Sequence, residues 1–484
     1  MRNAWKQALN KLTEQGASYA DVRYYPQEDS SILVMFNGNL LHFQYQQEKG
    51  YGVRVLFNGA WGFAASSDLA KKDLTFRAAL ENARTAARRI KSPVLLADKE
   101  VLSGEFISPC ALDPFEVETK EQIAMMQWLD RQINQEGVVN RQVVIQTNRK
   151  NIHYYDTEGA EIEKTITDIY PFISVMGTDD DGVMQERKYQ PPRLYDTRGW
   201  EIMRRENWEK EADRIVRELN ELRRAPLCPQ DLRSVILLPD MMFLQVHETI
   251  GHPLELDRIL GYELSFAGGS FVRLEDFGKL QYGSSKLTVR ADATVTNSPG
   301  SFGFDDDGVA CQNRLLIDKG VLVGAISSRQ SAREANEAVG REIFSGSGGA
   351  ARSTSFYRAP IDRMTNINVD PGEDGSLEDI VKNTERGLIL GGEKSWSIGS
   401  NREQFHFATD IGWLVEDGVN KGVVRNTTYG GDTLEFYRSL SAVGDASTWE
   451  LQYINNCGKG APSQIMQLGH GIPVCRFDNV KVGR

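Results

Sequence analysis

The fold class is decided by the stretch SILVMFNGNLLHFQYQQEKGYGVRVLFNGAWGFAA, residues 31–65. β-branched, aromatic and other apolar residues recur in short runs, and clusters of Asn, Gly and Lys separate the runs. Asn-Gly pairs between such runs are typical of tight hairpin turns. The pattern predicts turns at residues 37–39, 48–50 and 58–60, and antiparallel strands at residues 31–36, 40–45, 51–57 and 61–65.

Helical patterns flank this meander. Residues 3–16 carry apolar side chains at helical spacing, with Trp5, Ala8, Leu9 and Leu12 on one face. A sheet with helices on one face is the α+β arrangement that such an order of elements favours. The further elements that we expect are helices at residues 73–90, 120–136 and 200–224, and strands at residues 21–25, 138–147, 151–155 and 160–176, with a turn at residues 148–150.

The composition changes near residue 225. The long charged helix expected at residues 200–224 is followed by Ala225-Pro226, and beyond it Gly and short β-prone runs become frequent. One hydrophobic core rarely grows past about 250–300 residues, so a chain of 484 residues predicts more than one domain. We predict an N-terminal α+β domain, residues 1–225, and a C-terminal mostly β domain, residues 226–484, of sandwich or barrel type.

Charge and composition exclude several classes of function. Lys and Arg number 56 against 67 Asp and Glu, a net charge of −11, whereas nucleic-acid binding needs a concentrated basic face. We find no apolar stretch of about 18 residues and no secretory signal, so we expect neither a membrane span nor export. The five cysteines are scattered and contain no CxxC pair, which favours a reducing cytoplasm.

Two of the six histidines lie in the segment His247-Glu-Thr-Ile-Gly-His252. In the HExxH motif of zinc hydrolases the histidines are i and i+4 on one helix face. Here they are i and i+5, which an ideal helix would point about 140° apart. Either a π-type turn aligns them, or the helix ends before His252. Gly251 and Pro253 are compatible with both alternatives.

The motif alone leaves the third ligand open. A catalytic zinc site has three protein ligands and one open position, and a further histidine, a cysteine or one of the carboxylates Glu255, Asp257 and Glu263 could complete it. Because Pro253 interrupts the helix, Glu255 is expected to support a ligand rather than to bind metal. The two histidines could also be ordinary polar caps or packed core residues.

The segment 247–257, HETIGHPLELD, resembles the HExxGHxxExD tract of TldD subunits in the TldD/PmbA metallopeptidase family. The resemblance extends over essentially the whole chain. It is carried further by residues 51–64, 304–308, 315–320, 363–366, 387–407, 414–418 and 456–459. This chain departs from the family pattern in the Gly- and Ser-rich residues 345–350 and in His406.

The resemblance implies a zinc ion held by His247, His252 and Cys457, with Glu248 as the catalytic base. PmbA (TldE) subunits typically lack the HExxxH motif, so the chain resembles the catalytic, TldD-type subunit. A thiolate suits Zn²⁺ as a soft anionic ligand. The family also implies a dimer, either with a PmbA/TldE-like subunit or with a second copy.

The remaining histidines and cysteines are assigned from their neighbours. His42, His153 and His406 alternate with apolar residues in expected hairpins and are interpreted as sheet histidines. His470 follows Cys457 closely and is predicted to bind substrate, with an ordinary loop histidine as the alternative. The core is the expected place of Cys110, Cys228, Cys311 and Cys475.

Together these observations predict a zinc metallopeptidase that hydrolyses peptide bonds in unfolded or extended peptides, because an extended chain can pair with an exposed sheet edge. Two alternatives stay open. The chain could be a non-enzymatic partner-binding protein with a structural zinc site, or a metal-dependent amidohydrolase acting on small substrates. Glu248 separates the first alternative from an enzyme, since a structural site does not need a base beside the metal.

Overall fold

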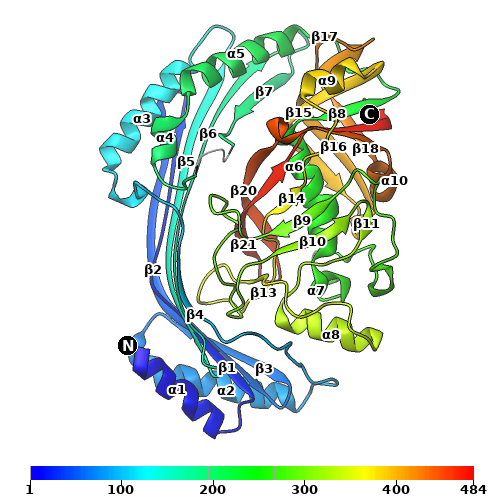
Figure 1. Ribbon diagram of the computed structural model, residues 1–484. Helices are drawn as coiled ribbons and strands as arrows, with labels where there is room; N and C mark the ends of the chain where they lie inside the picture. The colour runs from blue at the N-terminus through cyan, green and yellow to red at the C-terminus, as the bar shows by residue number, and fades with distance from the viewer. Residues whose placement is uncertain (1, 193–195, 266–267, 484) are drawn as a thin grey trace.

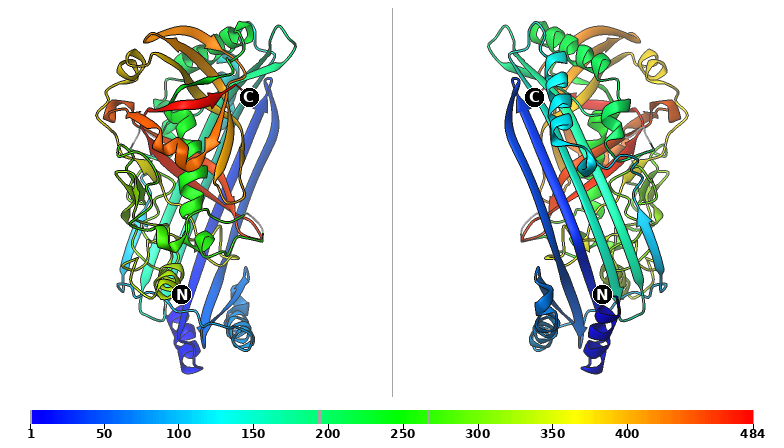
Figure 2. Two further views of the ribbon diagram at one scale, coloured as in Figure 1. Left: turned by 90° about the vertical axis from the view of Figure 1, so that its right-hand side faces the viewer. Right: turned by 90° about the vertical axis from the view of Figure 1, so that its left-hand side faces the viewer.

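The N-terminal sheet is long and curved, and the C-terminal body lies on its concave side (Figure 1). The computed structural model describes residues 2–192, 196–265 and 268–483. The strands of the sheet run along most of the length of the molecule, with the N-terminus at one end (Figure 2). The expected α+β fold class, with a barrel-like C-terminal sheet, is confirmed.

The N-terminal sheet has the strand order β3-β2-β1-β5-β6-β4, with β7 also paired to β6, among the described residues. Neighbouring strands are antiparallel except for the parallel pair β4 and β6. Its strands are β1 (Tyr19–Phe36), β2 (Asn39–Phe57), β3 (Ala60–Ser66), β4 (Ser103–Ile107), β5 (Asn140–Asp156), β6 (Glu161–Thr178) and β7 (Met184–Tyr189).

Two of the predicted turns are confirmed and two are wrong. Asn37-Gly38 and Asn58-Gly59 have positive φ angles and close the β1–β2 and β2–β3 hairpins, as Asn-Gly turns do. Residues 48–50 and 148–150 instead lie inside β2 and β5. Tertiary contacts outweigh the local turn preference at both places.

The contacts at these two places are specific. Arg149 and Lys150 of β5 pair with Asp29 and Glu28 of the neighbouring β1, at 2.7 and 2.9 Å. A Cβ atom at Gly50 would overlap the ring of Phe356. The glycine therefore permits the C-terminal body to approach β2 closely.

Helices cover the two ends of the sheet, where they form separate apolar cores. The single helix expected at residues 200–224 is wrong, because Asn207 interrupts it and caps the second part through a hydrogen bond from Lys210 N at 3.2 Å. The helices are α1 (Arg2–Glu14) and α2 (Lys72–Ala87) at one end, and α3 (Thr119–Gln132), α4 (Glu201–Arg205) and α5 (Trp208–Arg224) at the other, with short turns η1 (Leu69–Lys71) and η2 (Pro114–Glu116).

The C-terminal body is built around a sheet of order β15-β8-β22-β18-β16-β17, in which β15 also pairs with β16 and β19 with β22. The additional β15–β16 pairing closes the sheet into a barrel-like form. Its strands are β8 (Leu232–Leu237), β15 (Arg386–Ile398), β16 (Gln404–Glu416), β17 (Val419–Val424), β18 (Thr428–Asp432), β19 (Leu440–Val443) and β22 (Cys475–Val482).

Smaller sheets and helices complete this body. The sheets are β11-β10-β9-β14, the pair β12-β13 and the hairpin β20-β21. Their bounds are β9 (Val289–Asp292), β10 (Asn313–Asp318), β11 (Val321–Leu322), β12 (Ala351–Arg352), β13 (Ile361–Asp362), β14 (Ile367–Val369), β20 (Glu450–Lys459) and β21 (Gln464–Ile472). The helices are α6 (Pro239–Val246), α7 (Leu256–Ile259), α8 (Arg329–Val339), α9 (Leu377–Lys382) and α10 (Thr433–Arg438), with turns η3 (His247–Gly251), η4 (His252–Leu254), η5 (Leu274–Asp276) and η6 (Ala446–Thr448).

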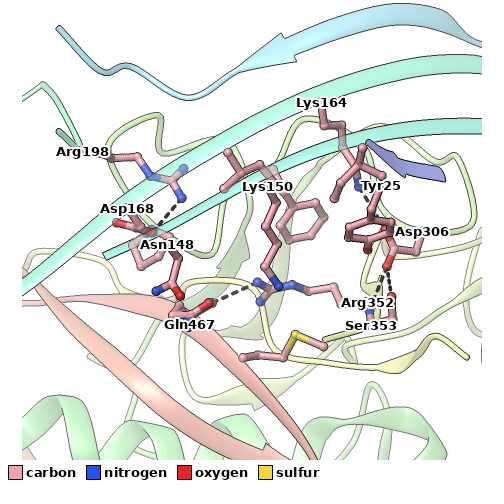
Figure 3. A pocket seen from close by; sticks show the side chains of 15 residues that line it. Tyr25, Asn148, Lys150, Lys164, Asp168, Arg198, Asp306, Arg352, Ser353 and Gln467 are labelled. Carbon is pink, nitrogen blue, oxygen red and sulfur yellow. Dashed lines mark hydrogen bonds and ion pairs between the residues drawn. The ribbon is translucent and has the colours of Figure 1, made fainter. Parts of the chain in front are cut away.

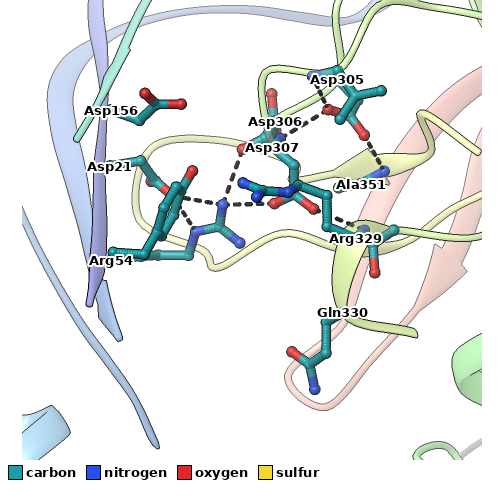
Figure 4. A network of polar contacts seen from close by, with 12 residues as sticks. Asp21, Arg54, Asp156, Asp305, Asp306, Asp307, Arg329, Gln330 and Ala351 are labelled. Carbon is teal, nitrogen blue, oxygen red and sulfur yellow. Dashed lines mark hydrogen bonds and ion pairs between the residues drawn. The ribbon is translucent and has the colours of Figure 1, made fainter. Parts of the chain in front are cut away.

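Buried charges hold the body against the sheet (Figure 4). Arg54 of β2 donates to Asp21 of β1 at 2.8 Å and to Asp307 of the C-terminal body at 2.7 Å. Lys164 of β6 lies 3.0 Å from Asp306. Removing one partner of a buried pair typically costs about 3–5 kcal/mol, so these pairs define how the two parts meet. The boundary between residues 225 and 226 stays a prediction.

Within the described ranges, no helix has the length and apolar character needed to cross a membrane.

The contact at Gly50 can be tested by a matched pair of substitutions. We expect Gly50→Ala to lower the free energy of unfolding by about 1–3 kcal/mol, because a Cβ atom forces β2 away from Phe356. Gly431→Ala is the control, since nothing lies within 4 Å of its Cβ position; a change within about 0.5 kcal/mol is expected. Equal effects of both in urea denaturation would contradict this account.

Candidate metal centre

The HExxxH segment begins where the buried helix α6 ends. All residues of α6 except Asp240 are buried and most of them are apolar, as expected of a helix inside a core. It continues into a π-helical turn, η3, in which the N–H of His252 donates to the carbonyl of His247. Of the two alternatives, the π turn is the one present. It places the two imidazole rings 4.7 Å apart, centroid to centroid.

Two contacts support the π turn. A Cβ atom at Gly251 would overlap the sulfur of Met364. Only glycine at this position allows the backbone to lie so close to Met364. The hydroxyl of Tyr282 donates to the carbonyl of Thr249, which satisfies a backbone acceptor inside the turn. The turn is therefore held by the C-terminal core and not by local preference alone.

Cys457 reaches the histidines from β20. The ligand atoms of His247, His252 and Cys457 all lie within 4.8 Å of one another. The Cys457 sulfur is 3.7 Å from His252 Nε2. Tetrahedral zinc, with Zn–S of about 2.3 Å and Zn–N of about 2.1 Å, would place such atoms about 3.6 Å apart. The donor set and its spacing fit a zinc ion.

Each histidine is oriented through its Nδ1 atom. His252 Nδ1 lies 3.0 Å from Glu255 Oε2, and His247 Nδ1 lies 2.9 Å from His470 Nε2. These contacts leave the Nε2 atoms as the ligand atoms, and carboxylate or other acceptors behind metal-binding histidines are common. The role of Glu255 in supporting a ligand stays a prediction, and its contact with His252 is compatible with that role.

His470 lies behind His247 in the buried part of β21. Its second nitrogen, Nδ1, is 3.0 Å from the carbonyl oxygen of Ile367. Because both nitrogens contact protein atoms, the geometry favours a role in orienting His247 over the predicted contact with substrate.

The electrostatic surroundings favour the ligand forms of these side chains. Burial lowers the pKa of His247 to about 4 and also lowers that of His252, so both imidazoles are neutral near pH 7. Burial alone would raise the pKa of Cys457, but Arg363 and His252 outweigh it and lower that pKa. Arg363 Nη2 lies 3.0 Å from the sulfur. Two neutral imidazoles and a thiolate would leave a bound zinc ion with one net positive charge.

Glu255 is held as a carboxylate. Burial would raise its pKa, but Lys459 and His252 lower it well below the usual value. Lys459 Nζ lies 3.3 Å from Glu255 and 2.5 Å from Asp257. Asp257 is therefore engaged away from the ligand cluster, and Glu263 accepts a hydrogen bond from Gly460 N at 3.3 Å.

Glu248 lies at the edge of the cluster with 7% of its surface exposed. Arg402, from the turn between β15 and β16, donates to Glu248 Oε2 at 2.8 Å. Arg363, Arg402 and Lys459 all lie in tracts that carried the family resemblance, but their contacts with this cluster were not predicted. No local signal in the sequence indicates a contact between residues as far apart as Arg402 and Glu248.

The other histidines and cysteines lie outside the cluster. His42 is exposed on β2, His406 is exposed on β16, and His153 lies 3.3 Å from Glu163 in the N-terminal sheet. Cys228 and Cys475 are buried as predicted, whereas Cys110 and Cys311 are only partly buried. All five cysteines are free thiols.

Three buried ligand residues beside a glutamate outside the ligand set match the arrangement of a catalytic zinc site, which keeps one position open. Residues 231–484 match the family model of the PmbA/TldA metallopeptidase C-terminal domain, and residues 20–87 match that of PmbA/TldA metallopeptidase domain 1. The chain belongs to the TldD/PmbA metallopeptidase family.

Relatives of similar length support this assignment. A metalloprotease of Methanothermobacter thermautotrophicus is 27% identical over 477 residues, which cover 97% of this chain and 96% of the relative. A zinc metalloprotease TldD homolog of Saccharolobus solfataricus is 22% identical over 490 residues, 98% of each chain.

Solved structures share the fold along the whole chain. A crystal structure from Thermotoga maritima aligns with a TM-score of 0.74 and 17% identity, covering 100% of both chains. The structure of TldE from Thermococcus kodakarensis aligns with a TM-score of 0.69 and 15% identity, also covering 100% of both.

The metal centre predicts a specific stoichiometry. We expect about one zinc per chain in the purified protein, and loss or strong weakening of binding in Cys457→Ser. Glu255→Gln should weaken zinc affinity about 10- to 100-fold, because it removes the carboxylate behind His252. Metal analysis and chelator competition measure both effects. Cys110→Ser is the control and should bind zinc normally; full zinc content in Cys457→Ser would contradict the ligand assignment.

Proposed function

We propose that this chain is a zinc-dependent peptidase with His247, His252 and Cys457 as ligands and Glu248 as general base. The observation that carries the proposal is the position of Glu248. It is adjacent in sequence to a ligand histidine and remains outside the ligand set, as the base in HExxH hydrolases does. A closed structural zinc site would have four protein ligands, and only three such residues gather here among those described.

Zinc, when bound, lowers the pKa of water and polarises the substrate carbonyl. The chain's own residues do the rest. Glu248 accepts a proton from the attacking water and delivers a proton to the leaving amine. Arg402 holds Oε2 of that carboxylate, which leaves Oε1 for the proton. His470 and Glu255 fix the ring orientations of the two histidines.

The substrate class follows from where the ligands lie. All three are buried in the C-terminal body, so a folded protein cannot reach them. Cys457 lies on β20 of the two-stranded β20–β21 hairpin. Backbone groups on the outer edge of β21 already contact Arg352, Asn366 and Asn368, so β20 is the strand that we propose to pair with an extended chain. We infer that the substrates are unfolded or extended peptides, bound mainly through their backbone.

We also infer a dimeric assembly, as a homodimer or with a PmbA/TldE-like subunit. The similarity in fold to TldE supports such a partner. Five free thiols favour a reducing compartment, and we place the protein in the cytoplasm.

Replacing the base separates an enzyme from a partner-binding protein with structural zinc. Glu248→Gln should retain zinc but lower kcat about 100- to 10,000-fold, because general-base catalysis contributes on that scale. Peptide hydrolysis and zinc content are measured on the same sample. Glu342→Gln, at an exposed position, is the control and should keep both. Unchanged turnover in Glu248→Gln would exclude this mechanism.

Substrate form provides a second test. We expect a reduced and alkylated protein to be cleaved at least about 100-fold faster than its native, disulfide-bonded form, since a native state populates unfolded chain at well below one per cent. Equal rates for the two forms would refute the requirement for an extended chain. Faster hydrolysis of small amides than of peptides would favour the amidohydrolase alternative instead.

A further inference from the structure

A pocket lined by several charged side chains lies between the long sheet and the C-terminal body (Figure 3). Its cavity measures about 60 Å³, enough for several water molecules or for one small charged group. Strands β5 and β6 form one wall, and segments around residues 302, 352 and 466 form the other. The charged groups that line it are Lys150, Lys164, Asp168, Arg198, Asp306 and Arg352.

The charges of the pocket do not balance. Lys164 pairs with Asp306 at 3.0 Å and Arg198 pairs with Asp168 at 2.9 Å. Lys150 pairs with Glu28 at 2.9 Å. The remaining cation, Arg352, has no carboxylate within ion-pairing distance in the described part of the chain. A substrate carboxylate would complement the charge of Arg352.

The hydrogen bonds of Arg352 also leave some of its N–H donors without a partner within the described ranges. Its guanidinium donates to the carbonyls of Met364 and Gln467, at 2.8 and 2.9 Å, and lies over the Phe302 ring. A guanidinium has five N–H donors, so three remain without a partner among the residues described. Burial, and then the neighbouring Arg363, lowers the pKa of Arg352 to about 10. A carboxylate that joined Arg352 would form a charge-assisted hydrogen bond with it.

The pocket adjoins the metal centre through the β20–β21 hairpin. Met466, which lines the pocket, is the direct cross-strand partner of Cys457. Side chains of such partners lie on the same face, with Cβ atoms about 5 Å apart. Met364, whose carbonyl accepts from Arg352, directly follows Arg363, and Arg363 contacts the Cys457 sulfur. These contacts connect Arg352 to the residues around Cys457 through Met364 and Met466.

We propose that Arg352, supported by Lys150, forms a subsite that binds a carboxylate of the peptide substrate beside the scissile bond. This inference rests on the proposed peptidase function and deepens it. The carboxylate can be the C-terminus of the peptide, which makes the enzyme a carboxypeptidase, or the side chain of an Asp or Glu. Both sources present the same charge to the guanidinium, and bidentate binding of a carboxylate is the geometry that arginine favours.

Four peptides of one neutral sequence distinguish the sources: free acid, C-terminal amide, and the amide with one internal Glu at either of two positions. We expect the wild type to cleave a carboxylate peptide about 10- to 100-fold better in kcat/KM than the neutral amide. Preference for the free acid assigns the C-terminus, and preference for an internal Glu assigns a side chain. Equal kcat/KM for all four would overturn the subsite.

Variants connect the preference to the pocket. Arg352→Gln should reduce the ratio of carboxylate to amide kcat/KM to near one, Arg352→Lys should keep part of it, and Lys150→Met should reduce it less than Arg352→Gln. Arg314→Gln, which removes an arginine outside the pocket, should leave the ratio unchanged. Melting curves identify any variant that fails to fold. An unaltered ratio in folded Arg352→Gln would overturn the proposal.

Binding separates failure of this subsite from failure of the proposed function. Fluorescein-labelled acid and amide peptides are titrated against Glu248→Gln, and fluorescence anisotropy gives Kd. Tighter binding of the acid, about 10- to 100-fold, supports the subsite even if the wild type cleaves neither peptide, in which case the peptidase proposal fails. Equal Kd values with normal wild-type cleavage would overturn the subsite alone.

Discussion

The π turn between His247 and His252 is the constraint on which the candidate metal centre depends. An α-helical turn would direct the two imidazoles to different sides, and no movement of other elements could then bring both to one ion. The turn places the N–H of His252 on the carbonyl of His247. Isolated π turns are disfavoured and are frequent at functional sites. Here Gly251 and the hydroxyl of Tyr282 stabilise the turn through the surrounding core.

Cationic side chains around the turn favour the thiolate form of Cys457 and the carboxylate form of Glu255. Cationic groups contact the sulfur of Cys457 and the carboxylates of Glu255 and Glu248, and they come from three separate strands or turns. Because the centre is buried, each of these pairs acts in a medium of low effective dielectric. Arg352 lies further along the same region, and among the described residues no carboxylate pairs with its positive charge. A substrate carboxylate would compensate that charge, which connects the pocket to the reaction.

Local sequence signals failed where the two parts of the molecule touch. Residues 48–50 and 148–150 have good turn chemistry, yet both are strand. Gly50 is needed for the approach of Phe356, and Arg149 is paired across β1 and β5. Turn residues express local backbone preference, which is worth about 1 kcal/mol, while a long two-sided sheet adds many hydrogen bonds and cross-strand contacts. The helix expected at residues 200–224 failed for the opposite reason, since a local cap at Asn207 divides it.

The sequence by itself determined the α+β class, the Asn-Gly hairpins, the family resemblance and the residues of the metal motif, because each of these is written in neighbouring residues or in a short pattern. Only the tertiary structure decided between the π turn and an early helix end, oriented His470 toward His247, and placed Arg402 on Glu248. Those outcomes depend on packing and charge contacts between segments that are distant along the chain. Such contacts have no local periodicity or spacing by which one sequence could reveal them.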